Sequence, residues 1–109
     1  MKNILVVCGA GASSTFLAHR MRRLIFARRL DLTVQAASQS GLDARLPEFD
    51  VLLVGPHLAA DFDELVLLAD RFGVETALLP DSVFSDGGDA DALDRALTLL
   101  IPATPKELQ

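Results

Sequence analysis

The stretch Asn3 to Thr15, NILVVCGAGASST, decides how this sequence folds. Its unbroken apolar run, Ile4 to Val7, predicts a β-strand that is covered on both faces. A loop of small, uncharged residues follows, and it starts at Cys8, the only cysteine of the chain. From about Ser13 apolar side chains return at helical spacing. This order of strand, small-residue loop and helix is typical of the first unit of a parallel α/β sheet.

The remaining sequence continues the alternation of strands and helices. We expect further strands at residues 32–37, 50–54 and 74–79, and helices at residues 13–28, 60–72 and 89–101. Gly73 is expected to stop the middle helix, and Asp89 to cap the last one. Such an alternation implies right-handed crossovers. The predicted fold class is α/β: a four-stranded parallel sheet in the order 2-1-3-4 with helices on both faces, flavodoxin-like or phosphatase-I-like.

Length and composition favour one domain. The 109 residues, half of them hydrophobic (50%) and 23% charged, fit an ordinary soluble globular chain. We assign residues 1–102 to a single domain and residues 103–109 to a C-terminal tail. No apolar run approaches the roughly 20 residues that span a bilayer. A lone cysteine fits a reducing compartment, so we expect a cytoplasmic location.

Charge is distributed unevenly along the chain. The net charge of -5 argues against a nucleic-acid partner. Up to Leu30, however, the sequence contains six basic residues and no acidic one. The arginines of the first predicted helix, Arg20, Arg22 and Arg23, therefore either form a solvated helix face or steer a negatively charged partner toward the cysteine loop.

The loop after the first strand has the chemistry of an anion site. A turn between a strand and a helix N-terminus gathers backbone N–H groups and the positive end of the helix dipole. The same field favours a thiolate, so Cys8 is the candidate catalytic nucleophile, able to hold a phosphoryl group on sulfur. Its alternative role is that of a small core hydrophobe at a strand end. The predicted phosphate-binding residues are Gly9, Ala10, Gly11, Ala12, Ser13, Ser14 and Thr15.

Three other uses of such a loop fit less well. A Walker loop needs a lysine that is absent between Lys2 and Lys106, and a dinucleotide fingerprint needs a glycine or alanine where Ser14 stands. Low-molecular-weight tyrosine phosphatases have an arginine six positions after the cysteine, which clamps the phosphoryl oxygens in the transition state. Ser14 occupies that position here as well. The missing guanidinium favours a phosphoryl carrier over a hydrolase.

Three segments of the chain resemble the IIB components of the bacterial sugar phosphotransferase system, of the lactose/cellobiose/chitobiose type. That family typically has Cys-Ser-Ala-Gly-Met-Ser-Thr-Ser after its first strand, where residues 8–15 read CGAGASST. Residues 50–58, DVLLVGPHL, are similar to the family's Asp-Val-Val-Leu-Leu-Gly-Pro-Gln. Residues 78–97, LLPDSVFSDGGDADALDRAL, resemble its last strand, Asp-containing loop and closing helix. The likeness extends over about residues 3–101.

The resemblance implies a protein-phosphocysteine–sugar phosphotransferase. Cys8 would accept a phosphoryl group from a phosphohistidine on a IIA partner and pass it to a sugar held by the IIC membrane permease, without a cofactor or a metal. His57 stands for the family's glutamine and Ser85 for a common tyrosine; with Asp81 they are candidate rim residues. The alternatives are a small cysteine-dependent phosphatase or arsenate-reductase-like enzyme, and a regulatory binding module on the same fold.

Overall fold

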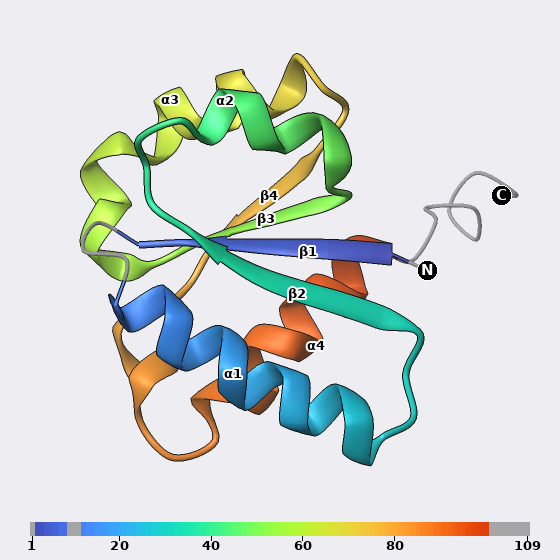
Figure 1. The fold of residues 1–109 in the computed structure, drawn as a ribbon. Helices are drawn as coiled ribbons and strands as arrows, with labels where there is room; N and C mark the ends of the chain where they lie inside the picture. The colour runs from blue at the N-terminus through green and yellow to red at the C-terminus, as the bar shows by residue number, and fades with distance from the viewer. Residues whose placement is uncertain (1, 9–11, 101–109) are drawn as a thin grey trace, which may run out of the picture.

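The computed structural model describes residues 2–8 and 12–100. Four parallel strands form one sheet in the order β2-β1-β3-β4, which confirms the predicted order (Figure 1). The strands are β1 (Lys2–Val7), β2 (Leu32–Ala37), β3 (Val51–Val54) and β4 (Glu75–Leu78). In the register of the sheet, Ile4 of β1 lies opposite Val34 on one side and Val51 on the other.

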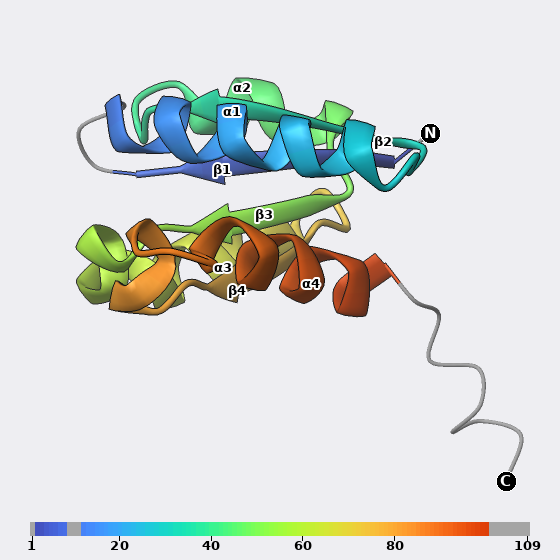
Figure 2. The ribbon, with the colours of Figure 1, turned by 90° about the horizontal axis from the view of Figure 1, so that it is seen from below.

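Helices cover both faces of the sheet, as predicted. α1 (Ala12–Ala27) and α4 (Gly88–Leu100) lie on one face, and α2 (Leu42–Arg45) and α3 (Phe62–Asp70) on the other (Figures 1 and 2). Three short 3-10 helices complete the described chain: η1 (Leu46–Glu48), η2 (Pro56–Asp61) and η3 (Asp81–Phe84). Among the described residues, no helix is long and apolar enough to cross a membrane.

Alternate side chains of the strands supply two hydrophobic cores. Because β1 and β3 are the central strands and are covered on both faces, they are continuous apolar runs. Ile4, Val6 and Leu53 pack with Leu17, Met21 and Leu93 on the side of α1 and α4. Leu5, Val7, Leu52 and Val54 pack with Leu42 and Leu65 on the side of α2 and α3.

The described helix boundaries differ from the sequence prediction by one or two residues. α1 spans Ala12–Ala27, where residues 13–28 were predicted. The helix expected at residues 60–72 begins at Phe62, because η2 occupies residues 56–61 as a tighter 3-10 segment, and it ends at Asp70. Gly73, with a φ of 71°, follows its last turn. Asp89 does not cap the last helix, because α4 begins one residue earlier, at Gly88. A Cβ at Gly88 would overlap the Val83 backbone, so only glycine fits there. The predicted helix end at Ile101 and the tail 103–109 lie outside the described residues.

Candidate functional site

Cys8 lies at the carboxyl edge of the sheet, where sequence reasoning placed the site. It follows β1 directly and its exposed fraction is 0%. The Gly55 N–H, just after β3, donates to the Val7 carbonyl at 2.8 Å and joins the ends of these two strands. α1 begins at Ala12 on the same edge. The thiol therefore lies between the first and third strands, at the switch point where doubly wound sheets bind ligands.

Gly55 leaves the space that the sulfur occupies. Its φ of -65° and ψ of 154° are ordinary extended backbone, so conformation does not require a glycine there. The requirement is steric: a Cβ at Gly55 would overlap Cys8 Sγ and lie 3.3 Å from both Cys8 Cβ and the Val7 carbonyl oxygen. The Gly55 backbone thus packs directly against the Cys8 thiol.

The predicted phosphate-binding residues fall into two groups. Gly9, Ala10 and Gly11 lie outside the described residues, whereas Ala12, Ser13, Ser14 and Thr15 form the first turn of α1. The N–H groups of a first helical turn point out of the helix end, toward a site such as the one at Cys8.

Ser14 has a second task within that turn. Its side chain is fully buried, and the hydroxyl donates to the Ala37 carbonyl at the end of β2, over 3.3 Å. This hydrogen bond attaches the start of α1 to the carboxyl end of β2. Ser14 therefore contributes to the position of the helix N-terminus as well as to its backbone donors.

The three predicted rim residues lie on η2 and at the two ends of η3, at the same edge of the sheet. The Leu58 N–H donates to the Gly55 carbonyl at 3.0 Å, so the chain turns back directly after the residue that contacts the thiol. His57 lies inside this turn; it is exposed and stacks on Phe84 of η3, with ring centroids 5.7 Å apart and an interplanar angle of 30°. Asp81 starts η3 and Ser85 follows its end, and both are exposed.

Phe84 is the residue at this edge that sequence reasoning missed. It is partly buried against the core formed with α1 and α4, and it carries His57 on its outer face. It lies in residues 78–97, for which the resemblance implied only a last strand, an Asp-containing loop and a closing helix. The available signal was an aromatic side chain in an otherwise polar stretch, adjacent to the position where the resembling family commonly has a tyrosine.

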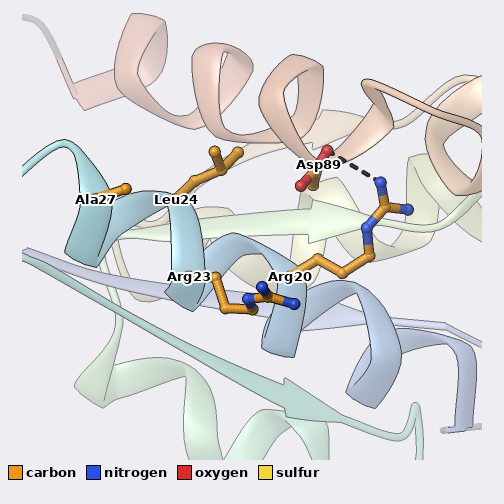
Figure 3. Close-up of a pocket in the computed structure, with 5 residues that line it drawn as sticks. All are labelled: Arg20, Arg23, Leu24, Ala27 and Asp89. Atoms are coloured by element: carbon orange, nitrogen blue, oxygen red, sulfur yellow. Dashed lines mark hydrogen bonds and ion pairs between the residues drawn. The ribbon is translucent and has the colours of Figure 1, made fainter.

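Two of the arginines in α1 have partners within the fold. Arg20 forms an ion pair with Asp89 of α4 at 3.2 Å, and Arg22 donates from Nε to the Val34 carbonyl of β2 at 2.9 Å. Figure 3 shows Arg20 reaching across to Asp89, over a pocket of about 320 Å³. The residues that line this pocket are Arg20, Arg23, Leu24, Ala27 and Asp89. Arg20 and Arg22 thus attach α1 to its neighbours, which favours a structural role for both.

The sequence is similar to those of known proteins. Residues 3–79 match the family described as the PTS system, lactose/cellobiose-specific IIB subunit. A relative in Bacillus subtilis, the PTS system oligo-beta-mannoside-specific EIIB component, is 23% identical over 101 residues, which are 93% of this chain and 98% of the relative. The lactose-specific EIICB component of Lactococcus lactis is 27% identical over 73 residues, 67% of this chain but only 13% of that longer protein.

Two solved structures have the same fold. The lactose-specific IIB component domain of the phosphoenolpyruvate:carbohydrate phosphotransferase system from Streptococcus pneumoniae superposes with a TM-score of 0.78 at 15% identity, over 89% of this chain and 95% of that one. The cellobiose-specific phosphotransferase IIB component from Borrelia burgdorferi gives a TM-score of 0.73 at 23% identity, over 90% of both chains.

Proposed function

Since this chain belongs to the lactose/cellobiose-specific IIB subunit family of the sugar phosphotransferase system, we propose that Cys8 is the residue on which it carries a phosphoryl group. The observation that supports this assignment is the position of Cys8, the chain's single thiol. It lies directly after β1, against the Gly55 backbone and on the edge where α1 begins. A helix N-terminus there favours both a thiolate and the phosphoryl dianion that replaces it.

The transfer requires two displacements at phosphorus. The Cys8 thiolate attacks the phosphohistidine of a IIA protein; an S–P bond forms, the N–P bond breaks, and the histidine nitrogen leaves with the bonding pair. A sugar hydroxyl then attacks the same phosphorus, the S–P bond breaks, and the thiolate is restored while the hydroxyl proton goes to solvent. In both steps the backbone N–H groups of residues 9–15 hold the phosphoryl oxygens.

The features around Ser14 support a carrier over a phosphatase. A cysteine phosphatase relies on an arginine at this position to stabilise the charge that develops when water attacks. Here the side chain is a buried serine that is hydrogen-bonded to Ala37. Water attack on the phosphocysteine is thus deprived of its main stabilising group, and the group can persist until the sugar receives it.

Membership of this family is also the basis on which we propose the phosphoryl donor and the sugar-presenting partner. The phosphoryl donor is a IIA protein and the acceptor sugar is presented by a IIC permease; the fusion of a IIB segment with IIC in the Lactococcus lactis relative supports that pairing. The relatives are named for lactose, an oligo-beta-mannoside and cellobiose, which are all β-linked sugars. We therefore propose β-linked disaccharides or oligosaccharides as substrates, and a cytoplasmic location for residues 1–102 as one IIB domain.

Intact-mass spectrometry tests the assignment of Cys8. The chain is incubated with a lactose/cellobiose-type IIA protein that has been charged from phosphoenolpyruvate by the general phosphotransferase proteins. Wild type should gain one phosphate, and Cys8→Ser should gain none, because a serine hydroxyl is not ionised at neutral pH. Labelling of the serine variant would place the acceptor elsewhere, and would refute the proposal.

A further inference from the structure

We propose that His57, held in place by its stacking on Phe84, donates a hydrogen bond to the phosphoryl group on Cys8; this inference rests on the function proposed above. The thiol, the start of α1 and the His57 ring all lie at one edge of the sheet. His57 is exposed, and its ring stacks on Phe84 with the ring centroids 5.7 Å apart.

Side-chain alternation places the thiol and the imidazole on the same face of the sheet. Ile4 and Val6 belong to the core with α1 and α4, and alternation along the strand continues this direction to Cys8. A Cβ at Gly55 would overlap Cys8 Sγ, so that residue faces the same way. Phe84 packs against this same core, and His57 stacks on it. Leu58, the next residue, turns to the opposite core instead.

The distribution of charge at this edge makes His57 the candidate partner of a negatively charged phosphoryl group. The segments that follow the four strands are residues 8–11, 38–41, 55–61 and 79–87; they contain neither lysine nor arginine, and His57 is their only histidine. The first turn of α1 has no basic side chain either. Asp61, Asp81 and Asp86 add negative charge to the same segments. Among the side chains of these segments, only His57 can therefore supply a positive charge beside a phosphoryl dianion.

An imidazole can donate the proposed hydrogen bond to the phosphoryl group. A neutral imidazole has one N–H donor and an imidazolium has two, and a hydrogen bond to an ionised acceptor is stronger than one between neutral groups. The stack on Phe84 restricts the ring, so less rotational freedom is lost when the phosphoryl group arrives. The family's glutamine at this position also has N–H donors, whereas a purely apolar ring would stack on Phe84 without donating.

Three variants separate the hydrogen bond from the stacking. His57→Phe keeps an aromatic ring on Phe84 and removes the donor, His57→Gln keeps a donor and removes the ring, and Phe84→Leu removes the stack beneath His57. His19→Gln is the matched control, because His19 is an exposed histidine further along α1. Urea unfolding of each unphosphorylated variant checks that the fold is retained.

The measured quantity is the equilibrium constant for phosphoryl transfer from the phosphorylated IIA protein to this chain. Intact-mass spectrometry gives the ratio of phosphorylated to unphosphorylated protein for each of the two partners, and the constant follows from these two ratios. This constant depends only on the separate proteins, so contacts made while the partners dock do not change it. His57→Phe should lower it about tenfold or more, the usual net effect of losing a hydrogen bond to a charged group. His57→Gln should stay within about threefold of wild type, and Phe84→Leu should lie between.

Two results would overturn the proposal: a His57→Phe constant equal to that of wild type, or a His57→Gln constant as low as that of His57→Phe. If wild type is labelled at Cys8 while all variants share its constant, the role of His57 fails and the assignment of Cys8 stands. If wild type is not labelled at Cys8, both fail.

Discussion

Gly55→Ala tests whether the close approach of the third strand to the thiol is built into the fold. The added methyl group would overlap Cys8 Sγ and would also lie 3.3 Å from Cys8 Cβ and from the Val7 carbonyl oxygen. The backbone cannot easily retreat, because the Gly55 N–H is bonded to the Val7 carbonyl and the Leu79 N–H to the Val54 carbonyl, each at 2.8 Å. Strain must therefore appear either in the strand ends or at the cysteine.

The magnitude follows from the cost of overpacking. Adding one methyl group to a tightly packed interior usually lowers the free energy of unfolding by about 1–3 kcal/mol. Cys8→Ala removes the overlapping sulfur and leaves only the two tight contacts at 3.3 Å, which small shifts can relieve. The double variant should accordingly be more stable than the sum of the two single changes predicts, by about 1–2 kcal/mol.

Urea unfolding monitored by circular dichroism measures this coupling in the four proteins of the cycle. Equal slopes across the set are needed before the free energies are compared. If the two single effects add to within about 0.5 kcal/mol, the methyl group and the sulfur do not compete for the same space, and the steric explanation for Gly55 is wrong. The single Gly55→Ala variant should also accept less phosphoryl group, because its thiol is displaced.

Three further predictions concern phosphatase activity, the Ser14 hydrogen bond and the charge of Arg23. With p-nitrophenyl phosphate between pH 5 and 8 we expect turnover well below about 1 per second, and a rate above that would favour the phosphatase alternative. Ser14→Ala should lower the free energy of unfolding by about 1–3 kcal/mol, since the Ala37 carbonyl loses a buried donor; an unchanged urea midpoint would contradict this. Arg23→Gln should reduce both the association rate with charged IIA protein and its salt dependence, whereas no change in stopped-flow kinetics would make Arg23 a solvated surface residue.

Local patterns were sufficient to predict the fold. The strand at 32–37 was predicted at its observed bounds, and the unbroken apolar runs of β1 and β3 identified the two central strands. The errors arose where local patterns are ambiguous. Apolar spacing does not distinguish a 3-10 segment from the first turn of an α-helix, so residues 60 and 61 were assigned to the helix that starts at Phe62. Asp89 satisfies the rule for a helix cap, but a carboxylate in the first turn can equally pair with Arg20, which lies 69 residues away.

The candidate site likewise has features that the sequence predicted and features that it did not. The position of Cys8 at a strand end and the helix start after it are local features, and both were predictable. The contact of Cys8 with Gly55, the bond from Ser14 to Ala37 and the stack of His57 on Phe84 each join residues far apart in the sequence. Only the assembled sheet brings such pairs together, so no periodicity or motif could have indicated them.

The serine at position 14, in place of an arginine, suits a group that must be passed on. A guanidinium clamp would bind the phosphoryl group strongly and would also stabilise attack by water. Ser14 has no guanidinium, and its hydroxyl instead donates to the Ala37 carbonyl. Interactions that stabilise the phosphocysteine and the transition state of transfer equally do not speed the transfer. Without an arginine clamp that favours water attack, we expect the proposed phosphocysteine to persist until the sugar hydroxyl attacks it.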